Sequence, residues 1–186
     1  MKILDTNIDA VKQIKPDIFK DNRGYFFESF NENRYKEAGI DYNFVQDNVS
    51  KSSRGTVRGL HYQVGEFAQC KLCFVLYGRV LDVALDIRFG SPTFGKYVCI
   101  ELSADEHNQI WIPIGFAHGF SVLSDEAVFA YKCTALYSKK DERSIIFNDP
   151  DLAIDWKIEK PNVSEKDLTG KEFKKIGKDI KTISCR

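Results

Sequence analysis

The stretch RVLDVALDIR, residues 79–88, alternates large apolar side chains with acidic or small ones. The large apolar set is Leu81, Val83, Leu85 and Ile87, and the other set is Asp82, Ala84 and Asp86. Because successive side chains of a β-strand point to opposite faces of the sheet, this period of two predicts a strand with one apolar face. It is the clearest structural signal in the chain and favours a protein built from sheets.

Other strand-like segments lie on both sides of this stretch. In chain order they are YFFESF, FVQDN, VRGLHYQ, KLCFVLY, KYVCIEL, QIWIP, HGFSVL and AVFAYKCTALY, which ends at residue 137. Glycine, proline, asparagine and aspartate separate them, and long helical patterns between them are missing. Short strands at close spacing with turns between them are typical of a sandwich or barrel. We therefore expect an all-β fold.

Two short helices are expected beside the strands. NENRYKEAG, residues 31–39, is typical of a helix that ends at Gly39. SEKDL, residues 164–168, has Ser164 as a capping residue and Asp167 three positions later, which indicates a helix start. A chain of 186 residues is the length of one domain. We expect a single domain over 1–186, with 169–186 as a helical or frayed C-terminal extension.

Composition excludes several classes of function. The 27 basic and 27 acidic residues cancel, which argues against a nucleic-acid partner. No apolar run has the length of a membrane span. The first 14 residues lack an apolar core and include Asp5 and Asp9, so they do not resemble a signal peptide. The five cysteines are then expected to be free thiols in a cytoplasmic protein.

His61, inside VRGLHYQ, has three possible roles, as a base, a metal ligand or a packed residue. A metal site on one strand commonly uses His-x-His, but the position two residues on is Gln63, a weak ligand, and a catalytic metal normally needs three protein ligands. Metal binding is therefore disfavoured. CKLC at 70–73 is also a poor metal site, because residues three apart on a strand point to opposite faces. Buried thiols are the better interpretation.

Two further segments allow more than one interpretation. WIPIGFAHGF, residues 111–120, suits a tight hairpin, or a cavity rim that presents His118. Tyr131 and Tyr137 fall on the same face of the last strand-like segment, as core tyrosines or as site groups. Asp167 is explained by helix capping alone. These residues by themselves do not decide the function.

Several long motifs, taken in order, resemble the dTDP-4-dehydrorhamnose 3,5-epimerase family. They are DNRGYFFESF, FVQDNVSKSSRGTVRGLHYQ, QCKLCFVLYGRVLDVALDIRFGSPTFGKY, WIPIGFAHGF, YKCTALY and FNDPDLAIDW with VSEKD. The resemblance covers residues 10–168. Phe147 stands where the family usually has tryptophan, and Lys157 where proline often follows; both departures concern local packing.

The resemblance implies a cupin-type jelly roll that forms a homodimer and uses no metal or other cofactor. The implied activity is that of an isomerase, which inverts C3 and C5 of a dTDP-linked 4-keto-6-deoxyhexose on the way to dTDP-L-rhamnose and surface polysaccharide. It assigns His61 as general base, Asp167 as its paired carboxylate, Tyr131 as general acid and Tyr137 as the ring that stacks on thymine. The remaining matches are Lys71 and His118 around the sugar, and Arg23, Glu28, Gln46, Asn48, Arg58, Glu142 and Lys166 at substrate-contacting positions.

This chemistry suits the residue types. Inverting a carbon beside a ketone requires a base, an enolate and an acid on the opposite face. Histidine titrates near neutral pH, as a general base should. A carboxylate such as Asp167 orients such a ring, cationic or neutral donors stabilise the enolate oxygen, and arginine forks match phosphate oxygens.

The spacing of Arg58 and His61 gives a geometric expectation. A regular strand would point two residues three apart to opposite faces. If both serve one cavity, the strand must bulge or kink at Gly59, because glycine in a strand often marks such a break.

Three alternatives stay open at this point. The chain could be an epimerase that acts at a single carbon or on another 4-keto nucleotide sugar. It could be a metal-dependent cupin enzyme, such as a dioxygenase or a sugar ketoisomerase. It could also be a binding module for sugar nucleotides, although a binder has no need of base, acid and orienting carboxylate together.

Overall fold

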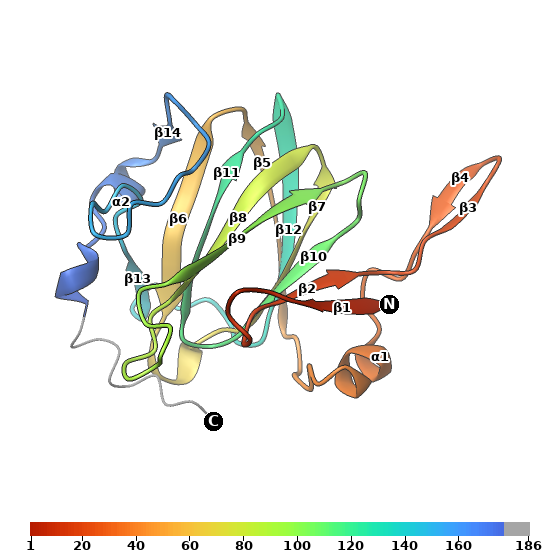
Figure 1. Cartoon of the computed structure of the whole chain (residues 1–186), viewed down its shortest axis with the longest axis horizontal. Coiled ribbons are helices and arrows are strands. Elements are labelled where there is room, and N and C mark those ends of the chain that lie inside the picture. The colour runs from red at the N-terminus through yellow and green to blue at the C-terminus, as the bar shows by residue number, and fades with distance from the viewer. Residues whose placement is uncertain (177–186) are drawn as a thin grey trace.

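In the computed structural model, which describes residues 1–176, two antiparallel sheets face each other as the layers of a jelly roll (Figure 1). The first has six strands in the order β1-β2-β10-β7-β12-β5. Their bounds are Lys2–Asp5 for β1, Lys12–Lys15 for β2, Gln109–Ile112 for β10, Lys71–Tyr77 for β7, Glu126–Cys133 for β12 and Gln46–Ser53 for β5.

The second sheet has the order β13-β6-β11-β8-β9, with β14 added in parallel to β6. Its bounds are Glu142–Ser144 for β13, Thr56–Gln63 for β6, Phe116–Val122 for β11, Arg79–Asp86 for β8, Tyr97–Ser103 for β9 and Asn162–Val163 for β14. The all-β prediction is confirmed. No helix within residues 1–176 is long and apolar enough to cross a membrane.

The helices are short. α1, Glu32–Glu37, is capped by the Asn31 side chain and is followed by Gly39 in the left-handed region, as expected. α2, Glu165–Leu168, begins after Ser164, whose hydroxyl accepts from the Asp167 N–H. Single 3₁₀ turns cover Gly65–Phe67 and Phe173–Lys175. Of the extension expected over 169–186, Ile176 is buried, and 177–186 lie outside the described residues.

The predicted strand at 79–88 is β8, but both of its faces are buried. Val80 and Ala84 point into the space between the sheets, with residues of the facing sheet such as Phe129. Leu81 and Val83 point the other way, under the segment 144–176. The larger apolar face is therefore covered by the C-terminal part of the chain. The smaller face, which carries Asp82, looks into the jelly roll.

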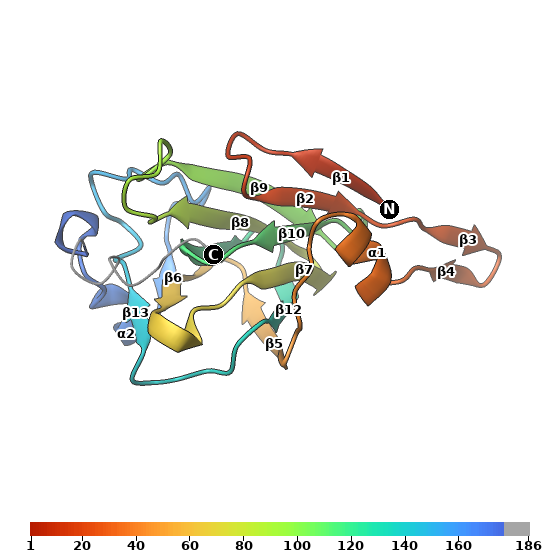
Figure 2. The same ribbon diagram turned by 90° about the horizontal axis from the view of Figure 1, so that it is seen from below.

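A hairpin extends from the body of the molecule (Figures 1 and 2). It consists of β3, Phe19–Asp21, and β4, Gly24–Phe26, and all six residues are exposed. The strand expected over 25–30 is therefore reduced to the short β4. The other expected strand that shortens is the last, because β12 ends at Cys133 and Tyr137 lies in the loop beyond it.

β6 bulges at Gly59, as predicted. In its pairing with β11, His118 lies opposite His61 and Phe120 opposite Arg58, so β6 has one residue more than β11 over this span. Gly59 has φ +127°, and the Gly59–Leu60 peptide is cis. Val57 and Leu60, three apart, lie in the same apolar cluster under the C-terminal segment. The bulge therefore returns Arg58 and His61 to one face.

Glycine is required on both strands at this point. A Cβ on Gly59 would lie 2.5 Å from Gly119 Cα, and a Cβ on Gly119 would lie 2.7 Å from the Arg58 carbonyl oxygen and 3.0 Å from the Trp156 ring. These contacts are with backbone or a buried ring, which cannot move away cheaply. The pair holds β6 and β11 at the distance that sets His61 beside His118.

We predict that Gly119→Ala lowers the free energy of unfolding by about 1–3 kcal/mol, the usual cost of overpacking. Because the displaced strands carry His61 and His118, turnover should fall as well, by about tenfold or more. Urea unfolding and steady-state kinetics measure the two effects. Gly90→Ala is the control, since Gly90 has φ +84° but open space around its Cα. Equal turnover in both variants would contradict the prediction.

Candidate active site

A cavity of about 240 Å³ opens between the two sheets. Its walls come from β5, β6, β7 and β12 and from the loop that follows β12. The lining residues are Gln46, Asn48, His61, Tyr62, Gln63, Gln69, Lys71, Tyr131, Tyr137 and Glu142. Most of the residues singled out in the sequence are therefore brought together, although their positions span nearly 100 residues of chain.

His61 and Asp167 form a hydrogen-bonded pair at one wall. His61 Nε2 contacts Asp167 Oδ1, and the Ser164 hydroxyl donates to Asp167 Oδ2 over 2.9 Å. The Asp167 side chain is 5% exposed and that of His61 27%. The capping turn of α2 therefore fixes the carboxylate, and the carboxylate fixes the imidazole. Asp167 therefore takes part in the capping turn and also contacts His61.

The pKa of Asp167 reflects competing effects. Burial alone would raise it, but the hydrogen bond and charge of His61, the hydroxyl of Ser164 and the charge of Lys166 hold it below the ordinary value for aspartate. The carboxylate is therefore ionised at neutral pH and favours the imidazole tautomer with a proton on Nε2. Nδ1 is then left as a proton acceptor.

Tyr131 faces the cavity from the opposite sheet. It lies on β12, whereas His61 lies on β6, and both side chains line the same cavity. Burial raises the pKa of Tyr131 to about 12, with further contributions from Cys133, Cys73 and Glu142, against the charge of Arg58. The Lys71 ammonium lies 5.7 Å from the centroid of the Tyr131 ring. The phenol is thus protonated across the usual assay range.

His118 lies behind the cavity wall on β11. It is buried, its Nε2 is 2.9 Å from Asp82 Oδ2, and the Cys73 sulfur is 3.9 Å from the same nitrogen. Burial lowers the pKa of His118 despite the opposing charge of Asp82, with Lys71 and His61 adding to the decrease. The ring is neutral and held by Asp82, close to the cations of the site.

Cys73, Asp82 and His118 are also the group within residues 1–176 whose geometry most resembles a metal site, since their ligand atoms lie within 4.8 Å of one another. A thiol binds metal as thiolate. Burial raises the pKa of Cys73 well above its usual value, and the charge of Asp82 adds to this. The donor set therefore fits a hydrogen-bonded histidine better than a metal centre.

A chain of polar contacts holds Tyr137 at the mouth of the cavity. Its N–H donates to Gln46 Oε1 over 2.8 Å, and its hydroxyl donates to Glu142 Oε2 over 3.0 Å. Lys166 Nζ lies 2.6 Å from the other oxygen of Glu142. The ring itself is exposed and free to stack on a planar group.

Comparison with known proteins decides the family. The family model described as dTDP-4-dehydrorhamnose 3,5-epimerase matches residues 5–175. The chain belongs to this family. It is 51% identical to the dTDP-4-dehydrorhamnose 3,5-epimerase of Shigella flexneri over 93% of this chain and 96% of that protein.

Solved structures of the family share the fold. A dTDP-6-deoxy-D-glucose-3,5-epimerase from Legionella pneumophila, in complex with dTDP-4-keto-L-rhamnose, superposes with a TM-score of 0.93 at 51% identity, covering 96% of each chain. A second structure is that of ChmJ of Streptomyces bikiniensis, a 3'-monoepimerase solved with dTDP-quinovose. It superposes with a TM-score of 0.88 at 31% identity, covering 94% of this chain and 89% of that one. The cupin-type jelly roll expected from the sequence motifs is thus confirmed.

The two departures from the family pattern lie outside the cavity lining. Phe147 packs in the cluster under the C-terminal segment, and its carbonyl accepts a hydrogen bond from the Trp156 indole over 2.7 Å. Lys157 is on the surface and pairs with Asp155. Within residues 1–176, both positions affect packing and surface contacts, as expected.

Two expected contact residues lie away from the cavity of their own chain. The Arg23 side chain, at the tip of the hairpin, is 85% exposed and pairs with Asp21. Glu28 lies at the base of the hairpin and pairs with Arg34 of α1. Arg58 lies closer to the cavity, because its charge acts to lower the pKa of Tyr131, which lines the cavity. Its Nε donates a hydrogen bond to Ser52 Oγ over 3.1 Å.

Two supporting residues were missed in the sequence. Gln63 donates to the Phe67 and Leu136 carbonyls and accepts from the Ser138 N–H, so it fixes the loop that carries Tyr137. Asp82 holds His118. The signals were present, because Gln63 is two residues from His61 on one face and Asp82 is an acid within an apolar strand.

We predict that Asp167→Asn lowers kcat by about 10²–10⁴, because an amide neither stabilises the imidazolium nor maintains the tautomer. Steady-state kinetics measure the loss. Asp155→Asn is the matched control, since Asp155 makes a surface pair with Lys157 and should leave kcat unchanged. If the two variants retain similar kcat values, Asp167 does not serve His61.

The same variant should change the dependence of stability on pH. The lowered pKa of Asp167 means that its ionised form stabilises the folded state above the ordinary carboxyl pKa of about 4, and that this stabilisation is lost as pH falls through the lower folded value. The difference in unfolding free energy between wild type and Asp167→Asn should therefore shrink in acid. A difference that grows on acidification would contradict the assignment.

Proposed function

We infer that the chain is an isomerase that converts dTDP-4-dehydro-6-deoxy-D-glucose to dTDP-4-dehydro-L-rhamnose by inverting C3 and C5. The observation that carries this is the placement of a carboxylate-held histidine and a protonated tyrosine on opposing sheets of one cavity, in a member of the 3,5-epimerase family. The product would feed the formation of dTDP-L-rhamnose for surface polysaccharide.

The proposed roles follow from the chemistry of a ketone. The C4 carbonyl acidifies the C–H bonds at C3 and C5. His61 takes one of these protons, and the electron pair of the C–H bond moves into an enolate on the C4 oxygen. As the carbonyl re-forms, the carbon takes a proton from Tyr131 on the opposite face. Exchange with solvent then returns the proton to Tyr131 and removes it from His61.

Lys71 is proposed as the donor that stabilises the enolate, with His118 behind it. Its ammonium lies 5.7 Å from the centroid of the Tyr131 ring, and both residues line the cavity. A single donor of this kind is worth about 10²–10³ in rate. Because the ketone itself supplies the acidity, the reaction as proposed needs no metal or redox cofactor.

The nucleotide is proposed to bind at the mouth of the cavity. The exposed Tyr137 ring suits stacking on thymine, and the hydrogen bonds from its backbone N–H to Gln46 and from its hydroxyl to Glu142 hold the residue in place. Gln46, Asn48, Glu142 and Lys166 surround the entrance, and Arg58 provides a cation for the pyrophosphate. Structures of relatives hold dTDP-4-keto-L-rhamnose, or TDP with pyrophosphate, which supports this class of ligand.

We propose that the active form is a homodimer in which the hairpin of each chain reaches the cavity of the other. Arg23 belongs to the expected substrate contacts, yet it lies in the turn between β3 and β4, on the hairpin that extends away from the body of its own chain (Figure 1). An exposed cation on a projecting arm, with Phe19, Tyr25 and Phe26 also exposed, is suited to contact a second copy. We place the protein in the cytoplasm, where buried free thiols such as Cys70 and Cys133 persist.

An epimerase acting at a single carbon is the second candidate. The 31% identity to a 3'-monoepimerase with a TM-score of 0.88 shows that the same fold serves that reaction. The base and acid would be the same, and only the orientation of the sugar would differ. Counting the carbons that exchange protons separates the two.

We predict that wild-type protein incubated with dTDP-4-dehydro-6-deoxy-D-glucose in D₂O incorporates deuterium at both C3 and C5. His61→Ala should exchange at neither carbon, because the base is missing, while dTDP affinity stays within about twofold, since the nucleotide contacts are intact. NMR of the sugar and calorimetry with dTDP give the two readouts. Exchange in wild type should survive dialysis against EDTA.

Different outcomes identify the alternatives. Exchange at one carbon only indicates the monoepimerase. Loss of exchange on chelation, restored by a metal ion, indicates a metal-dependent enzyme. Unchanged exchange in His61→Ala removes His61 from the role of base.

The dimer proposal predicts complementation. Mixed dimers of Arg23→Ala and His61→Ala contain one cavity with an intact base and an intact partner hairpin. Refolding the two variants together should therefore restore turnover at low substrate concentration, where loss of a charge-assisted phosphate contact costs about tenfold or more. If Arg23 serves its own chain, the mixture should do no better than the separate variants.

A further inference from the structure

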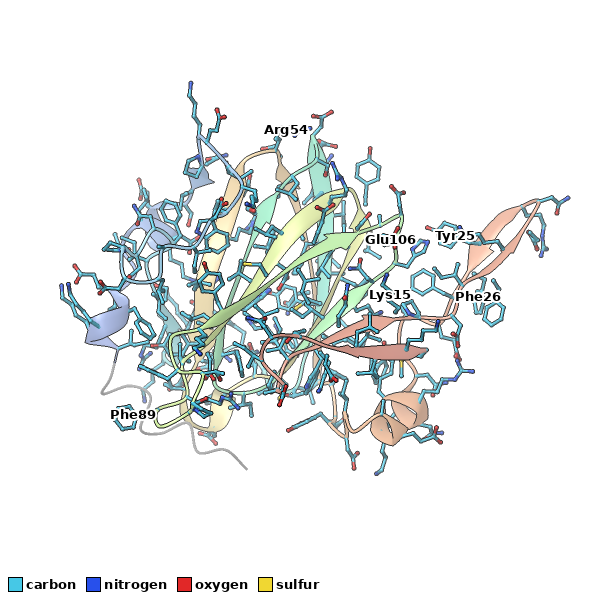
Figure 3. The ribbon with its side chains drawn as sticks, in the orientation of Figure 1. Lys15, Tyr25, Phe26, Arg54, Phe89 and Glu106 are labelled. Atoms are coloured by element: carbon cyan, nitrogen blue, oxygen red, sulfur yellow. The ribbon has the colours of Figure 1, made fainter. Side chains whose placement is uncertain are left out.

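The β3–β4 hairpin is joined to the body through a small aromatic cluster. Figure 3 shows the hairpin leaving the body near Lys15, with Tyr25 and Phe26 on it. Phe19 and Phe26 pair with each other along the hairpin, with ring centroids 6.5 Å apart. Tyr25 instead turns back towards the body and meets His107.

His107 packs against the middle of the hairpin's second strand and against the residue that follows it, with the rings tilted relative to each other. Its ring centroid lies 4.3 Å from that of Tyr25 and 4.7 Å from that of Phe27. Although His107 lies in the turn between β9 and β10, it is only 8% exposed, because these rings cover it. Neither the reaction as proposed nor the nucleotide contacts use this third histidine.

The turn that carries His107 is rigidly held. His107 has φ +54°, and its N–H donates to the Ser103 carbonyl over 2.9 Å. The neighbouring Asn108 side chain accepts from the Ser103 N–H over 3.0 Å and donates to the Glu101 carbonyl over 2.8 Å. The ring is thus presented from a fixed backbone to the base of the hairpin.

The charges around His107 come from three elements. Lys20 belongs to β3, Asp105 and Glu106 belong to the turn itself, and Lys15 at the end of β2 lies 3.8 Å from Glu106. Burial lowers the pKa of His107, and Lys20 adds to this, while Asp105 and Glu106 oppose it. The imidazole is therefore neutral at pH 7, because burial beside the two aromatic rings disfavours its charged form.

We propose that His107 is a positioning residue that sets the direction of the hairpin and thereby places Arg23 against the pyrophosphate in the partner subunit's cavity. This rests on the proposed function, in which the hairpin acts on the second chain. Without these ring contacts, the hairpin would sample many directions, and only one of them would bring Arg23 to the pyrophosphate. The apparent affinity for substrate would then fall in proportion to the fraction of time that the hairpin spends in that direction.

The test compares steady-state kinetics of His107→Ala, His107→Phe and Arg23→Ala in the dimeric enzyme. His107→Ala should raise KM about tenfold with kcat within twofold, because the base and acid are untouched. His107→Phe keeps an aromatic ring and should restore KM to within about twofold of wild type. Arg23→Ala should raise KM, and adding His107→Ala to it should raise KM no further.

The dependence on pH gives a second readout. The pKa of His107 is lowered, so the neutral ring prevails above the ordinary histidine pKa of about 6.5. The neutral ring is lost as pH falls through the lower pKa that His107 has in the folded protein. KM of wild type should therefore rise in acid more than KM of His107→Phe, which has no proton to gain. The other titrating groups are common to both proteins and cancel in the comparison.

The outcomes are distinct. Wild-type KM in His107→Ala overturns the proposal, while turnover by wild type still upholds the epimerase function. A KM unchanged in Arg23→Ala overturns it together with the role of the hairpin. Dissociation of His107→Ala into monomers, seen by sedimentation, overturns it in favour of a role in assembly. Absence of turnover in wild type contradicts the proposed function itself.

Discussion

The close approach of β6 and β11 at Gly59 and Gly119 is the constraint on which the site depends. Neither position has room for a side chain, and the extra residue in β6 at this point changes which face the following residues occupy. Without it, His61 would point with Val57 towards the C-terminal segment. With it, His61 faces the cavity and lies opposite His118 in the register.

The two sheets each contribute one of the two groups proposed to move protons. β6 presents the histidine, β12 presents the tyrosine, and the cavity between the layers is where a sugar ring would lie. A proton removed on one face and returned on the other is what inversion requires. The Asp167 carboxylate that contacts His61 comes from α2, far along the chain. Closing the C-terminal segment over the second sheet therefore both buries its apolar face and brings the carboxylate to the histidine.

The sequence predicted the segments of β4 to β12, both α-helices and the bulge, because alternation, capping residues and a strand glycine are local signals. It did not predict the short strands β1, β2, β3, β13 and β14. It paired His61 with Asp167 only through the family resemblance, since contacts between residues 106 apart leave no local pattern. The burial of both faces of β8 was not expected, because the covering segment after residue 144 has no regular pattern. The location of Arg23 at the tip of a projecting hairpin likewise depends on packing that spacing alone does not reveal.

The central claim is that base and acid act from opposite faces, and Tyr131→Phe in D₂O tests it most directly. If His61 removes the proton and Tyr131 returns one to the other face, this variant should still exchange deuterium into the substrate while formation of the inverted product falls by about 10²-fold or more. Exchange with retention of configuration would be the signature. If deuterium exchange and inversion are lost together, or both persist, the assignment of the two faces is wrong.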